Sequence, residues 1–482
     1  MDRKAVIIGA GPAGLTAGWE LTRGGVPVDI VEKYHLVGGI ARTELHNDYC
    51  FDIGGHRFFT MVPEVKKLWQ EWMGSGLLLR PRLSRIFYNG KFFNYPLRAV
   101  NALFGLGMWE SIRIVLSYLR AQTRPHGEEK TLEQWVSNRF GTRLYEVFFK
   151  TYTEKVWGIP CSEIRAEWAA QRIRGLTLPA AVRNALLPPK GEVIKTLIEE
   201  FHYPERGPGM MWERVAQLLQ EQGSAVHLES DAVKVLREGA RVTGVVVRNQ
   251  DGERTLAGTD VFSTMPLTEL IPMFDPLPPD EVLQAARGLR YRDFLTVVLI
   301  LDEPHLFSDN WIYIHSPDVR VGRIQNFKNW SPAMVPDSAK TSLGLEYFCD
   351  EGDSLWTMAD EELVALGTRE LRQIGIAHQA EFLDGVVVRQ RKAYPIYDAH
   401  YGELLTVVKE WLNGLENFYT LGRNGLHKYN NQDHSMLTAI LAVRNVLLGE
   451  KNDVWKVNTE RSYHEGGRVF PGGAEPVDIL DA

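Results

Sequence analysis

The chain has 482 residues, of which 44% are apolar and 24% charged, and this is enough material for a large core shared by two domains. The formal net charge is −7, so the chain lacks the basic field that non-specific nucleic-acid binding requires. Its three cysteines, Cys50, Cys161 and Cys349, are too far apart for a disulfide framework or a zinc knuckle, and they predict a protein of the reducing cytoplasm.

The first 32 residues have the pattern of a βαβ unit. Residues 4–9 read as a buried strand, 9–14 as a glycine turn, 15–23 as a helix with one apolar face, and 26–32 as a second, parallel strand. The apolar run at the start is short and leads into glycines, without the cleavage site of a secretory signal, so we expect no signal peptide.

The segment from about 63 to 187 reads as mainly helical, with one β hairpin expected at Asn89. Residues 99–119 are the most apolar long stretch, but a spanning helix would place Glu110 and Arg113 in hydrocarbon, so we expect no membrane span. A packed helix is the main interpretation of this stretch, and peripheral contact with a membrane is the alternative.

The rest of the chain returns to strand-like patterns. Two alternating runs, near 224–247 and 259–267, are expected to rejoin the nucleotide-binding core. Strands at 294–302 and 341–348 enclose a loop-rich section that we expect over the substrate, and residues 417–448 read as strand, glycine turn and helix.

Gly9, Gly11 and Gly14 form a GxGxxG turn between the first strand and the first helix. The three positions suit a tight turn, close approach of the backbone to a pyrophosphate, and close packing of helix on strand. The positive end of the helix would then point at the phosphates. Glu32 ends the second strand where a carboxylate can accept from both ribose hydroxyls and would repel a 2′-phosphate, so the motif favours FAD or NAD over NADP.

Two further glycine-containing segments distinguish FAD from NAD. Residues 37–43 hold a glycine pair and an arginine, and residues 51–56 hold another glycine pair followed by a histidine. Such segments let a chain wrap the remainder of a long dinucleotide, which NAD enzymes do not usually require. We therefore expect FAD.

Together these segments resemble the broad superfamily of amine oxidases, protoporphyrinogen oxidases and phytoene desaturases. Within it the chain is most similar to UDP-galactopyranose mutases of the eukaryotic type, through FDIGGH at 51–56, KVWGIP at 155–160 and GRNGLHKYNNQDHS at 422–435. The resemblance implies an α/β protein: a Rossmann-like FAD-binding domain of the amine-oxidase type, an inserted helical domain and a mixed β-sheet substrate domain.

The expected domains and FAD contacts follow from these motifs. The domains are a discontinuous FAD-binding domain over 1–62, 191–267 and 395–450, a helical insertion over 63–190, a β-rich substrate domain over 268–394, and a C-terminal tail over 451–482. The implied FAD contacts are Gly9, Gly11, Pro12, Ala13, Gly14, Glu32, Lys33, Gly38, Gly39, Ile40, Ala41, Arg42, Gly54, Gly55, His56, Val233, Gly422, Arg423, Tyr429, Asn431, Gln432 and Asp433.

The resemblance also implies a set of contacts to a nucleotide-diphosphate sugar. Arg172 and Arg323 match the two arginines that clamp the diphosphate, and His56 matches a loop histidine beside the flavin, so these three are assigned to catalysis. The implied substrate contacts are Tyr95, Trp157, Arg172, Trp311, Tyr313, Arg323, Trp330, Tyr394 and Tyr429.

Guanidinium forks and tyrosine hydroxyls suit a diphosphate, because they bind its oxygens and the guanidinium stays charged at any working pH. An apolar porphyrinogen or carotenoid has no use for such groups. The chain departs from the mutase pattern at three places. It has Trp330 where a tyrosine is expected, and Ile198 where an asparagine is expected. At 95–98 it has Tyr-Pro-Leu-Arg, where the mutases tend to have an aromatic residue followed by an amide. These departures concern the base and the sugar, not the flavin or the diphosphate.

Several of these residues have a structural alternative. Arg172 could form an ordinary ion pair on a helix, Trp330 could be a core aromatic, His56 could cap its turn, and Asp433 could be a helix N-cap. No HxxxH, HExxH or carboxylate cluster in the sequence points to a metal site.

The activity implied by the resemblance is interconversion of the pyranose and furanose forms of a nucleotide sugar, as in cell-surface polysaccharide biosynthesis. It would use reduced FAD through an adduct between flavin N5 and the sugar, with NAD(P)H as the candidate reductant. The alternative is an FAD-dependent oxidase or desaturase that removes a hydride from a carbon substrate. The expected partner is a nucleotide sugar, and a homo-oligomer is compatible with the sequence.

Overall fold

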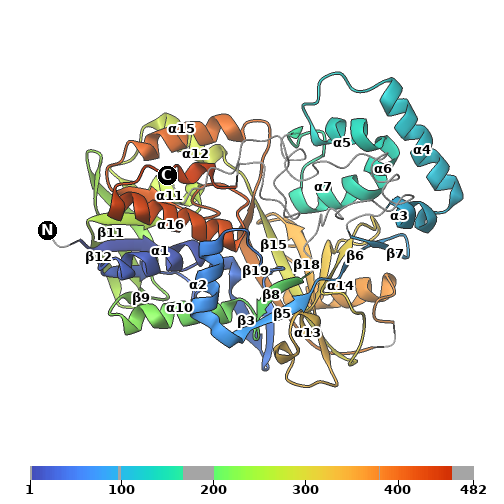
Figure 1. Ribbon diagram of the computed structural model, residues 1–482, viewed down its shortest axis with the longest axis horizontal. Helices are drawn as coiled ribbons and strands as arrows, with labels where there is room; N and C mark the ends of the chain where they lie inside the picture. The colour runs from blue at the N-terminus through green and yellow to red at the C-terminus, as the bar shows by residue number, and fades with distance from the viewer. Residues whose placement is uncertain (1–2, 96–98, 167–199, 379, 459–482) are drawn as a thin grey trace.

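The computed structural model describes residues 3–95, 99–166, 200–378 and 380–458. The chain forms an α/β protein in which a parallel sheet with its helices lies at the left of Figure 1, a seven-stranded sheet at the lower right and a group of helices at the upper right. This arrangement confirms the predicted fold class.

The nucleotide-binding half is built on a parallel sheet in the order β20-β13-β1-β2-β9. Its strands are β1 (Ala5–Ile8), β2 (Val28–Val31), β9 (Ala225–His227), β13 (Asp260–Ser263) and β20 (Phe418–Thr420). Along β1, Ile7 joins the core beneath one face of the sheet and Val6 the core beneath the other. A parallel sheet needs cover on both faces, and the all-apolar sequence of β1 provides for it.

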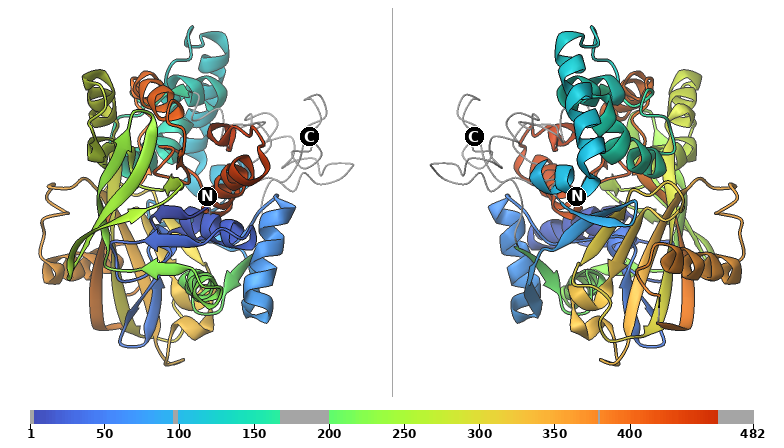
Figure 2. Two further views of the ribbon diagram at one scale, coloured as in Figure 1. Left: turned by 90° about the vertical axis from the view of Figure 1, so that its left-hand side faces the viewer. Right: turned by 90° about the vertical axis from the view of Figure 1, so that its right-hand side faces the viewer.

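Helices cover one face of this sheet and a second sheet covers the other. The covering helices are α1 (Pro12–Arg23), α2 (Pro63–Met73), α10 (Gly209–Glu221) and α16 (Gln432–Leu448). The second sheet has the order β12-β11-β10-β14, with β10 (Asp231–Glu238), β11 (Arg241–Asn249), β12 (Gly252–Ala257) and β14 (Phe274–Asp275), next to α11 (Leu267–Leu270), α12 (Asp280–Gly288) and α15 (Tyr401–Asn413). In the left view of Figure 2 these strands stand in green beside the blue parallel sheet. The run at 224–247 thus divides: β9 rejoins the parallel sheet as predicted, and β10 and β11 do not.

The seven-stranded sheet has the order β19-β15-β18-β17-β16-β6-β7. Its strands are β6 (Ser84–Tyr88), β7 (Lys91–Asn94), β15 (Tyr291–Asp302), β16 (Trp311–Ile314), β17 (Arg323–Asn326), β18 (Thr341–Cys349) and β19 (Glu381–Pro395), and α14 (Asp360–Gln373) packs on it. The strands predicted at 294–302 and 341–348 are confirmed as β15 and β18. The smaller elements are β3 (Thr43–His46), β4 (Tyr49–Asp52), β5 (Leu77–Pro81), β8 (Glu200–Pro204) and α13 (Phe327–Trp330).

The structure differs from the expected helical insertion over 63–190 in residues 63–94, which join other parts of the molecule. Helix α2 packs on α10 and α16 of the nucleotide-binding half, and β5 pairs with β8. The predicted hairpin forms, with left-handed φ values of 49° at Asn89 and 75° at Gly90, but β6 pairs in parallel with β16 and so extends the seven-stranded sheet. The sequence pattern predicted the hairpin itself but carried no information about its partner strand, where Trp311 pairs with Ser84 across 227 residues of chain.

In the described part of the helical layer, the longest helix is α4 (Met108–Thr123), with 16 residues. The other described elements of this layer are α3 (Ala99–Leu106), α5 (Leu132–Phe140), α6 (Thr142–Tyr145), a π-helical turn (Glu146–Lys150) and α7 (Thr151–Trp157). Among the described residues, no helix is both long and apolar enough to span a membrane. Residues 167–199, including Arg172 and Ile198, lie outside the described residues, as does the tail from 459.

Candidate functional site

The glycine turn has the geometry of an anion site. Gly9 takes a left-handed φ of 98°, and a Cβ on Gly14 would lie 1.9 Å from the carbonyl oxygen of Gly9. Helix α1 begins at Pro12 after Gly11, and no side chain caps its first turn. The free N–H groups of that turn, together with the helix dipole, form a place for a pyrophosphate.

The residues that follow β2 are organised by one carboxylate. Glu32 accepts hydrogen bonds from the backbone N–H groups of Ala10 (2.9 Å) and Tyr34 (3.0 Å), so it fastens the glycine turn to the end of β2. The Lys33 ammonium is 3.9 Å from Glu269 and largely exposed. Val233 lies at an irregularity of β10 where the pairing with β11 shifts, which leaves its backbone outside the regular ladder.

The second glycine pair packs directly on the first turn. Gly39 faces Gly11 so closely that a Cβ on Gly39 would lie 3.3 Å from the Gly11 Cα atom, and Gly38 donates to the Ala10 carbonyl oxygen at 2.8 Å. Ala41 is buried beside them. The Arg42 guanidinium donates to Glu44 (2.6 Å), to the Gly39 carbonyl oxygen (2.9 Å) and to Gln390 (2.9 Å). These contacts join the segment at 38–42 to β19.

The C-terminal segment closes over the same turn. A Cβ on Gly422 would lie 2.9 Å from the Cβ atom of Ala13, so only glycine permits this approach to α1. The structure also corrects one expectation: the N-cap of α16 is Asn431, in a capping box with His434, and Asp433 is already helical. Burial raises the pKa of Asp433 to about 7, and its Oδ2 atom has no hydrogen-bond partner within the described chain.

A cavity lies between this nucleotide-binding turn and the seven-stranded sheet. Residues from widely separated parts of the chain contribute to its wall. The lining residues are Ile40, Ile53, Gly54, Gly55, His56, Phe294, Arg323, Ala393, Tyr394, Arg423, Tyr429 and Asn431. Seven of these residues were predicted to contact the cofactor: Ile40, Gly54, Gly55, His56, Arg423, Tyr429 and Asn431. Three were predicted to contact the substrate: Arg323, Tyr394 and Tyr429, so Tyr429 was predicted for both.

Arg323 is held in place by a buried carboxylate. It lies on β17 directly opposite Glu346 of β18, and its Nε atom donates to Glu346 Oε2 at 2.8 Å. Gln325 donates to the other oxygen of Glu346 at 2.6 Å, and Arg323 reaches the Tyr394 hydroxyl at 3.3 Å. Burial alone would lower the pKa of Arg323, but the adjacent Glu346 charge outweighs it and raises that pKa above its ordinary value. The guanidinium is therefore permanently cationic.

Aromatic rings surround a second guanidinium. Tyr394 and Tyr429 stack with centroids 5.5 Å apart, and Arg423 lies 4.9 Å and 4.3 Å from their ring centroids. Trp157, at the end of α7, is 6.3 Å from Tyr394 and 6.1 Å from Tyr429. Arg423 also donates to the carbonyl oxygens of Ala393 (2.7 Å) and Asn430 (3.1 Å), and these two bonds fix the plane of the guanidinium. Four predicted site residues, Trp157, Tyr394, Arg423 and Tyr429, thus form one cluster.

His56 borders the cavity next to both guanidinium groups. Burial, with the positive charges of Arg423 and Arg323, lowers the pKa of His56 to about 3. Its Nδ1 atom is buried and has no hydrogen-bond partner in the part of the chain that the structure describes. The imidazole is therefore neutral at working pH, and one ring nitrogen remains available to a bound group.

Trp311, Tyr313 and Trp330 were all predicted to contact the substrate, and none of them lines this cavity. Tyr313 contacts Tyr95 and Trp311, at centroid distances of 4.8 Å and 6.2 Å. Trp330 is fully buried, stacks on Trp311 at 5.3 Å and donates its Nε1–H to the carbonyl oxygen of Asn310 at 2.9 Å. It lies beneath Gly55 and not on the cavity wall, as the core alternative for this residue predicted.

Two residues near this site were not singled out from the sequence. Glu346 lies in the buried, mainly apolar strand β18. A single charged residue in such a strand needs a buried partner, and this was the sequence signal that could have identified it. Arg82 packs its guanidinium 5.4 Å from the ring centroids of both Tyr95 and Trp311, and its nitrogens are buried without a hydrogen-bond partner in the described chain. It adds a third cation on the side of Tyr313.

Comparison with known proteins identifies the family. The sequence profile of the flavin-containing amine oxidoreductases matches residues 12–402. The chain therefore belongs to this family. A curated relative from Klebsiella pneumoniae, named a probable UDP-galactopyranose mutase, is 27% identical over 172 residues, which are 34% of this chain and 44% of the relative. The match thus spans less than half the length of that relative.

Solved structures of the same fold include both mutases and oxidases. A reduced UDP-galactopyranose mutase superposes with a TM-score of 0.82 at 22% identity, covering 96% of this chain and 100% of the other. A protein from Exiguobacterium sp. 255-15 that carries a provisional protoporphyrinogen oxidase name gives a TM-score of 0.71 at 17% identity, over 93% and 100% of the two chains. At these identities the likeness concerns the fold, and it confirms the amine-oxidase-type architecture.

The residues of this flavoenzyme fit FAD. The uncapped first turn of α1 and the touching glycines Gly11 and Gly39 form a cradle that any larger side chain would fill. The unpartnered Nδ1 atom of His56 and the cavity at 53–56 lie where the far end of a long dinucleotide would reach. Within the described residues, no group of three or more His, Cys, Asp or Glu side chains could hold a metal ion.

Proposed function

We propose that this flavoenzyme is a mutase that interconverts the pyranose and furanose forms of a nucleotide-diphosphate sugar, similar to UDP-galactopyranose mutase. The observation that supports this most strongly is the Arg323–Glu346 pair at the cavity. A buried carboxylate fixes a permanent cation on the wall opposite the FAD cradle, and the Nη1 atom of that cation makes no hydrogen bond within the described chain. Such a group suits an anionic leaving group and not a neutral hydrocarbon.

The surrounding residues would hold the diphosphate while the sugar is rearranged. Arg323 would bind diphosphate oxygens, and the hydroxyls of Tyr394 and Tyr429 would donate to them. Arg172 is assigned to the same clamp by the resemblance to the mutases. The chain would thereby keep the leaving group in place, so that it can return to the same carbon.

Reduced FAD would supply the nucleophile for the anomeric carbon, and NAD(P)H is the candidate reductant. Trp157 would close the sugar site from the side of α7, where its ring lies against Tyr394 and Tyr429. His56 would act as a neutral hydrogen-bonding partner of the flavin, because its low pKa prevents it from delivering a proton as imidazolium. Trp311 and Tyr313 would border the nucleotide side.

An FAD-dependent oxidase is the second candidate, and the aromatic cluster is the observation in its favour. The stacked rings of Tyr394 and Tyr429 resemble the faces that recognise an amine cation. However, Arg423 already occupies that face at 4.3 Å from Tyr429, and Arg323 stands next to Tyr394. Two fixed cations would repel an ammonium substrate, which favours the mutase proposal.

The deciding experiment incubates dithionite-reduced, FAD-loaded protein with UDP-, dTDP- and GDP-sugars and separates the products. The proposal expects an isomer of unchanged mass from at least one of them, together with thermal protection of the protein by the matching nucleoside diphosphate. Oxygen consumption with an amine or porphyrinogen substrate, without any protection by nucleoside diphosphates, would establish the oxidase instead.

A further inference from the structure

Helix α4 carries an apolar face that nothing in the described chain covers. The exposed side chains on it are large, with Trp109 77% exposed and Phe104 of the preceding α3 83% exposed. Scattered exposed apolar residues are ordinary, but a contiguous row of this size is not. The row consists of Phe104, Met108, Trp109, Ile112, Val115, Leu116 and Leu119.

The spacing of these residues places them on one side of the helix. At about 100° per residue, the six apolar positions of α4 span roughly a third of its circumference. Arg113 and Arg120 come next around the helix, and Arg124 follows in the same direction just after the last turn. All three are exposed. A row of arginines therefore borders the apolar row along one edge.

The opposite side of α4 is already packed on its own domain. Ile114 is fully buried, and the Ser117 hydroxyl accepts a hydrogen bond from the backbone N–H of Arg143 at 3.0 Å. At the edge of the apolar row away from the arginines, Gln122 donates to the carbonyl oxygen of Asn138 on α5 at 2.9 Å. The apolar row is thus not the inner face of a helix that still has to dock on the core.

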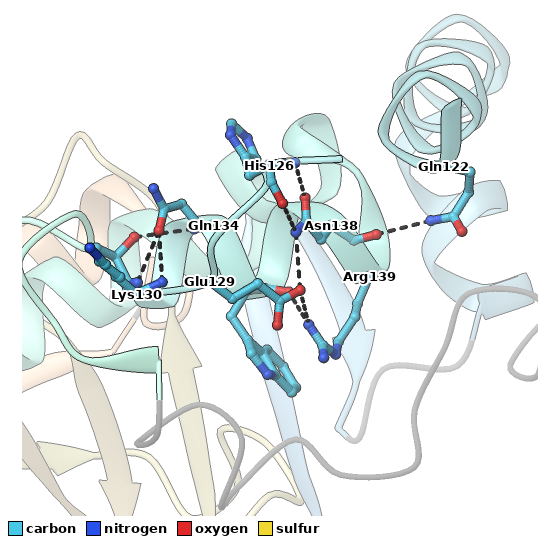
Figure 3. Close-up of polar contacts among 9 residues, drawn as sticks. Gln122, His126, Glu129, Lys130, Gln134, Asn138 and Arg139 are labelled. Atoms are coloured by element: carbon cyan, nitrogen blue, oxygen red, sulfur yellow. Dashed lines mark hydrogen bonds and ion pairs between the residues drawn. The ribbon is translucent and has the colours of Figure 1, made fainter. Parts of the chain in front are cut away.

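The loop after α4 is also fastened, as Figure 3 shows. Asn138 accepts from the backbone N–H of His126 at 2.8 Å and donates to its carbonyl oxygen at 3.0 Å. Glu129 accepts from Arg139 at 2.7 Å, and Gln134 accepts from the N–H of Lys130 at 2.9 Å. These contacts hold α4 against α5 in one orientation. In Figure 1 and in both views of Figure 2, the cyan α4 then stands at the outer rim of the molecule.

The charges beside the apolar row are of one sign. The one acidic residue of α4, Glu110, is bound by Arg143 of α6 and lies 3.8 Å from Arg113. It is therefore neutralised within the domain. The protein as a whole is acidic, with a net charge of −7, so this arginine edge runs against the overall composition.

We propose that the α4 face docks on the surface of an anionic lipid bilayer. An apolar face with tryptophan and arginines along its edge is the pattern of helices that lie at the lipid interface, where aliphatic groups enter the acyl region and arginines meet lipid phosphates. A symmetric contact with a second copy would bring two such faces together, with arginines on both and without a free acidic group on α4 to pair with them. Charge complementarity therefore favours the membrane over a dimer.

The test measures flotation of the full-length, FAD-loaded protein with vesicles of phosphatidylcholine alone and of phosphatidylcholine mixed with phosphatidylglycerol. We expect binding to the mixed vesicles that weakens with added salt, and much weaker binding to phosphatidylcholine alone. Trp109→Glu or Leu116→Glu should reduce binding to the mixed vesicles by roughly tenfold or more. Arg113→Gln and Arg120→Gln should each reduce it by about fivefold.

Leu277→Glu provides the matched control, because Leu277 is 59% exposed and lies far along the chain from α4, next to β14. It should bind mixed vesicles as the unmodified protein does, and all variants should retain the flavin spectrum. Equal binding of every variant, or absence of binding to the anionic vesicles, would overturn the proposal. A dimer in light scattering that Trp109→Glu converts to a monomer would also overturn it and would assign the face to a second copy.

Discussion

The glycine turn at residues 9–14 and the cavity wall that holds Arg323 and Glu346 are built in different ways. The turn takes its shape from the backbone of residues 9–14 themselves, as in the positive φ of Gly9, and the hydrogen bond from Gly38 to Ala10 adds support from the next segment. The wall depends on Arg323 and Glu346, which meet only because β17 and β18 pair. Local backbone geometry determines the first region, and a buried charge pair determines the second.

The difference teaches where each region is vulnerable. The turn should fail through steric collision, since a Cβ has no space at certain positions. The wall should fail through electrostatics, since a buried charge that loses its partner is costly. Substitutions in each region separate these modes of failure.

The largest effect is expected from Glu346→Gln. This change leaves the guanidinium of Arg323 buried beside a neutral amide, and we expect a loss of about 3–5 kcal/mol in the free energy of unfolding. Denaturant unfolding of the FAD-loaded protein measures it. A matched ion pair outside the cavity, Arg85 with the fully buried Asp309, offers the control Asp309→Asn, which should cost stability without changing nucleotide binding. A neutral outcome for Glu346→Gln would mean that Arg323 does not depend on this carboxylate.

Next comes Gly14→Ala, whose added Cβ would lie 1.9 Å from the carbonyl oxygen of Gly9. Because backbone must move, we expect a loss of about 3 kcal/mol in stability and little bound flavin. Gly11→Ala is the sharper companion, since the nearest atom to its Cβ is 3.8 Å away and its φ of −81° suits alanine. That variant should fold normally yet purify with reduced flavin absorbance. Full flavin content in Gly11→Ala would contradict the close approach of a pyrophosphate.

Arg323→Ala addresses the wall without touching the turn. The protein should remain yellow, while its affinity for UDP, or for whichever nucleoside diphosphate protects it, should fall by roughly tenfold to a hundredfold, as expected for a charge-assisted hydrogen bond. Isothermal titration measures this affinity. Because the change also strands Glu346, the double variant Arg323→Ala with Glu346→Gln should recover stability but not affinity. Unaltered nucleotide affinity in both would remove Arg323 from the substrate site.

The smallest effect concerns pH and His56. Its folded pKa of about 3 lies below the ordinary value of 6.5, so its contribution to stability is present above pH 6.5 and is lost as pH falls, because only the unfolded state takes up the proton. Between pH 7 and pH 5 this amounts to about 2 kcal/mol. His56→Asn should lose that share of the acid sensitivity, measured as the difference between unfolding free energies at the two pH values. An identical pH slope in the variant would show that folding does not lower the pKa of His56.

Much of the architecture could be read in advance where the signal was local. The βαβ unit at the start, the strands at 294–302 and 341–348, and the turn at Asn89 each follow from residue pattern over a few positions. The pattern failed where the partner was distant: the hairpin at 84–94 joins β16, and α2 packs on α10 and α16. Hydrophobic periodicity says which face of an element is buried but not against what.

The sequence by itself determined that a dinucleotide cradle forms, because glycines at 9, 11 and 14 and the carboxylate of Glu32 act on neighbouring backbone. Only the tertiary structure decided that Trp330 supports the loop at Gly55 from the core, that Glu346 fixes Arg323, and that α4 presents its apolar face outward. The physical reason is that burial and charge pairing depend on the path of the whole chain, whereas a turn depends on the dihedral angles of its own residues.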